Sequence, residues 1–526
     1  MTNAAVEMKA ASLGVRRRPH VRFGRLLLVT ASLIVAGAAL LPLAFLLLQA
    51  VQVGWTELWS VLWRPLTATL LWNTVRLTVC VTIGAAVIGV AAAWCTERTD
   101  LPLRRLWTVL LVLPLAVPDF VLGFGWNSLA PGVYGFWGSV LVMTTGSYPL
   151  VYLPVAAALR SADPDLEDVA RTLGSRRALA FARTVLQQIR PALLGGCLVV
   201  SLILLAEFGT FEILRFQTFS TEIFNEFEIG FNTPAACALS LVLVAIGLCL
   251  LVTEVVVRGP GVPRRGLGRP PRRARLGKLS PLVMIALAAL VGVSIGVPLW
   301  AIVYWFVQGS SSTLPATSLA HAALATAAYC SAAAISTFAA VPVALLVERR
   351  RTRLSMLLER STYIVLALPG LVVALALGYF SVRYFPTLYQ SSGELVFTYA
   401  VMFFPLALVV MRGSVAQAPA GLEDVARTLG HGRASIFLRI TLPLLLPGLL
   451  AAFALVFLVA STELTATLLL HPTGVETLAT QFWAYTSDFS YGAAAPYALT
   501  LMLVAMVPGV MLGFWFERIG GRRAAS

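Results

Sequence analysis

Apolar stretches long enough to cross a lipid bilayer recur along the whole chain. A helix crosses the ~30 Å of hydrocarbon in about 20 residues, and 59% of these residues are hydrophobic while only 12% are charged. Helices are the expected form, because lipid offers no partner for open backbone groups and the stretches lack the alternation of barrel strands. The prediction is an all-α polytopic membrane protein with about twelve transmembrane helices. Their expected limits are 26–50, 69–95, 106–126, 138–159, 191–208, 234–257, 281–307, 318–347, 361–380, 394–411, 443–462 and 494–516.

Basic residues predict the orientation of these spans. Apart from Arg64, Arg76, Arg215 and Arg383, all Lys and Arg residues lie in the N-terminus, the C-terminus or every second loop. Basic residues near span ends are retained in the cytoplasm, so both termini are expected there, in a multi-pass protein of the cell (inner) membrane. The formal charge of +15 is then explained by loops beside membrane lipid, and no nucleic-acid partner is expected.

A nine-residue segment occurs twice, letter for letter, at 166–174 and 422–430. The same offset of 256 also aligns Pro191 with Pro447 and Glu207 with Glu463. This pattern indicates a duplication into two halves in the same orientation, a parallel repeat. The expected divisions are a basic N-terminus (1–25), a first half (26–257), a basic cytoplasmic linker (258–280), a second half (281–516) and a cytoplasmic C-terminus (517–526).

Each copy of the repeat lies in a cytoplasmic loop of about thirty residues between the fourth and fifth spans of its half. We expect two short helices broken at Gly174 and at Gly430, because glycine tolerates the positive φ of a tight change of direction. Acidic residues open each loop and arginines close it, the favourable order for a helix dipole. Such an element can dock in a cleft on a partner. The alternative is an amphipathic helix that lies on the lipid headgroups.

These loops resemble the "EAA" loop of binding-protein-dependent ABC importer permeases: Glu-Ala-Ala, three residues, Gly, nine residues, Ile-x-Leu-Pro. The second copy fits throughout, whereas the first ends Thr184-Val185-Leu186-Gln187, which leaves open how it re-enters its span. The resemblance implies a type I ABC importer permease fold, two ABC ATPase subunits and a substrate-binding protein as partners, and ATPase coupling through these loops. The loop residues it assigns are Glu167, Asp168, Ala170, Gly174, Glu423, Asp424, Ala426, Gly430, Ile440, Leu442 and Pro443.

The sequence contains no phosphate-binding Gly-x-x-x-x-Gly-Lys-Ser/Thr motif, since neither Lys9 nor Lys278 completes one. ATPase activity is therefore expected on separate subunits. No catalytic, cofactor or metal site is expected, because the four histidines are scattered. A secondary carrier is the rival within transport, but such carriers usually hold buried charges at the midplane. Here the spans are nearly free of charge apart from Arg76 and Asp119.

Two outward stretches, 209–233 and 464–493, are rich in aromatic and acidic residues. Residues 206–210, 461–464 and 470–474 resemble the fused permeases of ferric-iron importers, which implies ferric iron as substrate. Thiamine importers share the fused plan, and polyamine, phosphonate, sulfate or another small solute are further alternatives. The stretches themselves could instead be solvated loops that dock the binding protein without touching cargo.

Glu207 and Glu463 occupy equivalent positions near the outer ends of the fifth and eleventh spans. Counted from Pro191 and Pro447 at about 1.5 Å per residue, each lies ~24 Å across the membrane. A carboxylate facing lipid there is costly, so both are candidates for the central pathway or outer gate of a cationic substrate. The alternative is that each bonds nearby backbone groups at a helix end.

Overall fold

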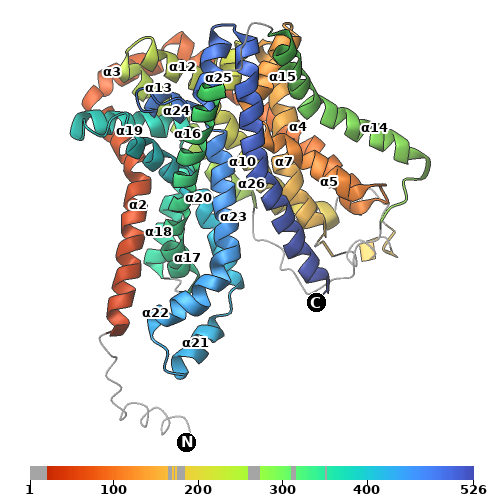
Figure 1. Cartoon of the computed structure of the whole chain (residues 1–526), viewed down its shortest axis with the longest axis vertical. Helices are drawn as coiled ribbons and strands as arrows, with labels where there is room; N and C mark the ends of the chain where they lie inside the picture. Colours follow the sequence, from red (N-terminus) through yellow and green to blue (C-terminus); the bar gives the residue numbers. More distant parts are fainter. Residues whose placement is uncertain are drawn as a thin grey trace, which may run out of the picture.

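The computed structural model describes residues 20–160, 162–163, 169–170, 172–174, 184–258, 273–309, 316–349 and 352–525. Within these ranges the chain is almost entirely helical (Figure 1). Ten helices are long and apolar enough to cross a bilayer, and two bent helix pairs pass the same test. The prediction of about twelve spans in an all-α membrane protein is thereby confirmed.

The elements follow the predicted spans closely, usually beginning and ending a few residues outside them. Up to residue 258 they are α2 (His20–Val53), α3 (Trp55–Leu62), α4 (Pro65–Arg98), α5 (Arg104–Val112), η1 (Leu113–Ala116), α6 (Asp119–Leu129), α7 (Gly135–Arg160), α10 (Leu186–Ala206), α11 (Gly209–Ile213), α12 (Phe219–Glu228) and α13 (Thr233–Arg258). The rest are η3 (Gly277–Leu279), α14 (Ser280–Val291), η4 (Gly292–Gly296), α15 (Val297–Gln308), α16 (Ala316–Ile335), η5 (Ser336–Ala339), α17 (Ala340–Arg349), α18 (Arg353–Leu366), α19 (Gly370–Tyr384), α20 (Ser392–Gln417), α21 (Ala420–Thr428), α22 (Arg433–Ile436), η6 (Phe437–Thr441), α23 (Leu442–Ser461), α24 (Thr465–Leu470), α25 (Leu478–Ser487) and α26 (Tyr491–Ala525).

The third and ninth predicted spans are each broken by a sharp bend. The first break, between Ala116 and Asp119, turns the chain by 91°, and the second, between Leu366 and Gly370, turns it by 103°. Pro118 and Pro369 stand directly before the second helix of each pair. Proline lacks an amide hydrogen and pushes the preceding residue out of the helical region, so neither helix continues through it.

The first membrane helix of each half packs against the other half. α2 contacts α17, α18 and α19 of the second half as well as α13 of its own. In return, α14 contacts α5 and α15 contacts α6. Leu287 of α14 accordingly belongs to the same buried cluster as residues of α4, α7 and α10. The two halves are therefore interlocked.

The two ends of the helix bundle differ in structure. Figure 1 shows α3, α12 and α25 at one end and α21 and α22 at the other, the end at which α26 terminates. The chain enters the second half beside the end of α4, where Ala274 N donates to Arg98 O at 2.7 Å. Among the described residues, the bridge between Thr99 and Ala274 is the one β-type pairing.

Candidate functional site

α21 is the short helix predicted at the start of the second loop, and it ends at Gly430 as predicted. Gly430 has a φ of 84°. Its N–H donates to Arg427 O, and His431 N–H donates to Ala426 O, both at 3.1 Å. These two bonds form a Schellman motif, which requires a left-handed residue at the glycine position. α22 follows, so the loop is two helices broken at the glycine.

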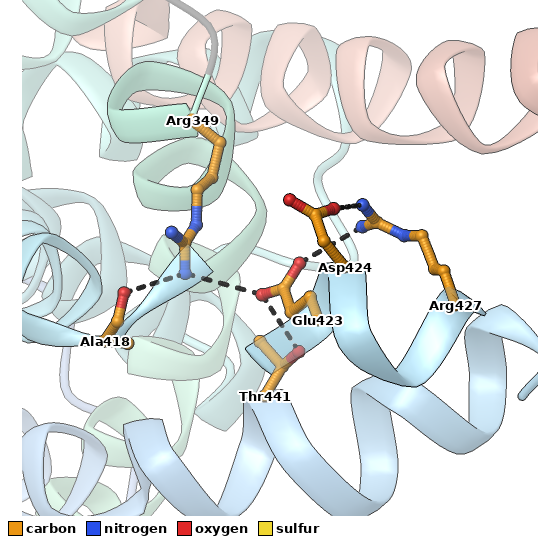
Figure 2. A network of polar contacts seen from close by, with 6 residues as sticks. All are labelled: Arg349, Ala418, Glu423, Asp424, Arg427 and Thr441. Carbon is orange, nitrogen blue, oxygen red and sulfur yellow. Dashed lines mark hydrogen bonds and ion pairs between the residues drawn. The ribbon is translucent and has the colours of Figure 1, made fainter. Parts of the chain in front are cut away.

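Glu423 is the centre of a polar network that fixes α21 to the spans (Figure 2). Its Oε1 lies 3.4 Å from Arg349 Nη2 at the end of α17 and accepts from Thr441 Oγ1 at 3.2 Å. Its Oε2 pairs with Arg427 Nη2 at 3.2 Å, and Arg427 Nη1 also bonds Asp424 Oδ1 at 2.5 Å. Because Arg349 also donates to Ala418 O at 3.1 Å, the entry to α21 and its first turn are held by one arginine.

One row of exposed side chains on α21 is apolar, although Asp424 and Arg427 are exposed on the same helix. Leu422, Val425 and Leu429 are exposed by 47%, 57% and 73%, whereas Ala426 is buried. Positions three and four residues apart share a face of a helix, so the three exposed side chains form one row. The network of Glu423 thus holds a rigid helix that presents an unpartnered apolar row.

The first loop repeats these features as far as it is described. Gly174 has a φ of 86°, Leu173 N–H donates to Val169 O at 3.0 Å, and Leu173 is exposed while Ala170 is half-buried. Glu167 and Asp168 lie outside the described residues.

Both loops re-enter the membrane in the same way. A π-helical turn precedes Leu442 in η6, where Ile440 lies, and Thr184 and Val185 are π-helical before Leu186. Pro443 occupies the first turn of α23, where the first half has Gln187. The proline is therefore not needed for this re-entry, because an amide-bearing residue fits the first turn of a helix equally well.

An ion pair beside each loop was not predicted. Arg160 Nη2, at the end of α7, lies 2.6 Å from Glu97 Oε1 at the end of α4. In the second half Arg412 Nη2 on α20 lies 2.7 Å from Glu348 Oε1 on α17. A signal existed in the sequence: Glu97-Arg98 and Glu348-Arg349 close equivalent spans.

At the opposite end, Glu207 and Glu463 each cap the short helix that follows. Glu207 Oε1 accepts from Thr210 N at 2.7 Å and from Thr210 Oγ1 at 2.6 Å. Glu463 Oε1 accepts from Ala466 N at 3.0 Å. Each glutamate therefore bonds a nearby backbone N–H at a helix end, as the alternative interpretation expected. Both side chains are only partly buried, and Gly209 packs against Leu464 across the halves, so the repeat brings the two carboxylates to the same region.

A third carboxylate belongs to this group. Asp119 begins α6 directly after the Pro118 bend, and the next residue, Phe120, packs against Gly209, two residues after Glu207. Its counterpart after the second bend is Gly370, where an added Cβ would lie 3.3 Å from Glu463 Oε1. Both bends thus bring the start of a helix close to a glutamate, and only the first adds a further carboxyl group, that of Asp119.

The outward stretches are packed helices, which corrects the alternative of solvated loops. α12 and α25 each begin with a threonine capping box, Thr218 with Thr221 and Thr477 with Thr480. The first residue of each helix donates its N–H to a threonine of a span: Phe219 to Thr74 at 3.2 Å and Leu478 to Thr326 at 2.9 Å. Short helices of this kind were missed because their apolar runs are too brief to stand out.

Aromatic rings join the two stretches across the halves. Phe208 lies 4.2 Å from Phe224 and 5.3 Å from Trp483, measured between ring centroids. Gly209 lies so close to the second half that an added Cβ would meet Leu464 Cδ2 at 2.7 Å. The end of the bundle beside Glu207 and Glu463 is thus closed by apolar contacts between the halves.

Acidic side chains crowd the outward face of α12. Burial, and then the nearby carboxylates of Glu226 and Glu212, raise the pKa of Glu222.

Comparison with known proteins agrees with a helical membrane protein of two similar halves. The sequence model of the family described as "Binding-protein-dependent transport system inner membrane component" matches residues 85–258 and 340–525. The chain is 38% identical over 480 residues to the Fe(3+)-transport system permease protein FbpB 2 of Haemophilus influenzae, covering 90% of this chain and 95% of the relative. It is 31% identical over 243 residues to the sulfate transport system permease protein CysT of Escherichia coli, covering 42% of this chain and 87% of the relative. It is 30% identical over 232 residues to the molybdenum transport system permease protein ModB of Mycobacterium tuberculosis, covering 40% and 87%.

Proposed function

Because this chain belongs to the family of binding-protein-dependent transport system inner membrane components, we propose that it is the permease of an ATP-driven importer. It takes substrate from an extracytoplasmic binding protein and releases it into the cytoplasm by alternating access. The observation that carries this proposal is α21, a rigidly held helix with an exposed apolar row of Leu422, Val425 and Leu429. An apolar helix face of this kind fits a groove on a partner.

The partners of the two loops are two ABC ATPase subunits, one for each loop. Both loops and both chain termini face the cytoplasm, and α12 and α25 face the binding protein. The distribution of basic residues supports this orientation, as does the position of α21 and the end of α26 at one end of the molecule (Figure 1). The purified complex should contain one copy of this chain per ATPase pair, measured by native mass spectrometry. Two copies per pair would contradict the stoichiometry.

The proposed substrate is ferric iron. The relative that covers nearly the whole chain is named for Fe(3+) transport, whereas the sulfate permease matches less than half of it. The carboxylates of Asp119, Glu207 and Glu463 also favour a cation, because they repel an anion such as sulfate at the outer end of the pathway. Thiamine remains the second candidate, since it too is a cation.

Replacing both Glu207 and Glu463 by Gln tests the pathway. Glutamine keeps the side-chain shape and can still accept from Thr210 N or Ala466 N, so the helix caps persist while the negative charge is lost. Uptake of radioactive iron by vesicles holding the complete importer should fall about tenfold, the size of a 1.4 kcal/mol loss of attraction. Glu476→Gln, outside the cluster, serves as the matched control. Native uptake by the double variant, with unchanged ATPase stimulation by the binding protein, would remove the pathway role.

A further inference from the structure

Three tryptophans form a row on the surface of α3, the short helix between the first two spans. Trp55, Trp59 and Trp63 are 71%, 47% and 70% exposed. The ring centroids of Trp55 and Trp59 are 5.4 Å apart, as are those of Trp59 and Trp63. Their spacing of four residues places them on one face of the helix. So large an aromatic surface is costly to leave in water.

The other faces of α3 have different partners. Leu58 and Val61 are buried against the protein, and α3 contacts α13 and α2. Glu57 and Ser60 are exposed and, at 100° per residue, point about 160° and 100° away from Trp59, while the exposed Thr56 lies beside the tryptophan row. The helix therefore has one protein-facing, one aromatic and one polar side, as a helix lying in a membrane surface requires.

The connections of α3 place it at the boundary of the membrane. Gly54, with a φ of 87°, turns the chain out of α2, and Arg64 and Pro65 lead directly into α4. α2 and α4 are both membrane spans, so α3 lies where one span ends and the next begins. Figure 1 shows it at the same end as α12 and α25. The exposed surface continues onto α4 at Trp72, which is 64% exposed.

A groove of about 250 Å³ lies beside the tryptophan row, between α3, α4, α12 and α13. Its apolar lining includes Leu62, Trp63, Leu71, Phe219 and Val242, and Arg64 lies among the lining residues. Phe219 is the first residue of α12, and Arg64 Nη1 lies 3.6 Å from Glu226 Oε1 on the same helix. The groove thus adjoins the outward helix at two points.

We propose that a phospholipid of the outer leaflet occupies this surface. The tryptophan row lies at the level of the headgroups, where amphipathic indole rings are favoured. One acyl chain lies in the groove against Leu71 and Val242, with the phosphate near Arg64. The lipid then lies beside the ion pair between Arg64 and Glu226 of α12, so the outward helix of the first half is supported partly by the bilayer. This inference does not depend on which substrate is transported.

Quenching by brominated lipids tests the position of the row. The full chain is placed in phosphatidylcholine vesicles whose acyl chains carry bromine near the headgroup or near the methyl end. The contribution of α3 is the difference in tryptophan fluorescence between the native chain and the W55F/W59F/W63F variant. Bromine near the headgroup should quench this difference about twofold more strongly than bromine at the methyl end, because the row lies shallowly in the bilayer. Trp107→Phe, which removes a buried ring, is the control and should show no such difference.

The same samples separate lipid from other occupants. If this fluorescence difference is quenched by neither brominated lipid but is quenched by acrylamide in the water, the proposal is overturned. Protection from acrylamide on adding the binding protein, without lipid quenching, would assign the row to that protein instead. For the groove, Val242→Phe should lower the number of phospholipids retained per chain by about one in native mass spectrometry. Val242→Leu is the milder variant in case the larger ring impairs folding, and unchanged retention in both would overturn the groove assignment.

Discussion

The two halves fasten the helix ends beside their loops with ion clusters of opposite charge. In the first half one glutamate faces two arginines, and in the second one arginine faces two glutamates. The members are Glu97 with Arg160 at 2.6 Å and Arg104 at 4.0 Å, and Arg412 with Glu348 at 2.7 Å and with Glu359. Both halves have one glutamate–arginine pair between equivalent helices, α4 with α7 in the first half and α17 with α20 in the second. The third member, which comes from the bent span, differs in sign.

This difference teaches that the packing of the helix ends, rather than the local charge, is what the duplicated halves share. The second cluster also continues into the loop, because Arg349, next to Glu348, pairs with Glu423. The end of α17 therefore links the spans to α21. Arg98 occupies the equivalent position in the first half, and its loop counterpart, Glu167, lies outside the described residues.

Among the variants suggested by this comparison, Arg412→Met is expected to destabilise the folded chain most. The change leaves Glu348 and Glu359, both mostly buried, facing each other without a cation, at a cost of about 3 kcal/mol. Arg160→Met should cost less, about 2 kcal/mol, because the deeply buried Glu97 keeps Arg104 at 4.0 Å. The apparent melting temperature of the purified chain measures both. Equal shifts for the two variants would show that the clusters are equivalent after all.

The next effect concerns the loop glycines. Gly430→Val and Gly174→Val should each strain the turn by about 1–3 kcal/mol, because a β-branched residue resists positive φ, and both should uncouple transport while the chain still inserts. We expect the larger loss of uptake for Gly430→Val, whose loop matches the family pattern throughout.

Gly432→Val is the matched control for these variants. It lies in the same loop with nothing within 4 Å of an added Cβ and without a positive φ, so its uptake should stay near native. Normal uptake by both Gly174→Val and Gly430→Val, with normal binding of the ATPase subunits, would rule out the assignment of these loops to coupling.

The smallest effects are expected at the outer end, where the halves are most alike. Thr74→Val and Thr326→Val each remove the acceptor for the first N–H of α12 or α25, at a cost of about 1 kcal/mol. The loss should be slightly greater for Thr326, whose bond is shorter, 2.9 Å against 3.2 Å. Hydrogen exchange at the start of α12 and α25 checks this, and unchanged protection in both helices would show that the threonines do not hold them.

The sequence predicted those features that depend on local properties. Apolar length predicted the spans, and the repeated segment predicted the helix break at Gly430. The bends at Pro118 and Pro369 were missed, because averaging hydropathy over a window hides a single proline. The network of Glu423 could not be predicted, since Arg349 lies 74 residues away and only the packed helices bring the two together.

The interlocking of the two halves has a consequence for synthesis in the cell. α2 is the first of the described helices to leave the ribosome, yet its partners α17, α18 and α19 begin about 300 residues later. At about 5–20 residues per second, α2 waits tens of seconds in the bilayer before they arrive. During that interval its unpartnered face is covered by lipid or by the insertion machinery. Assembly of the first half is therefore complete only when translation of the second half is well advanced.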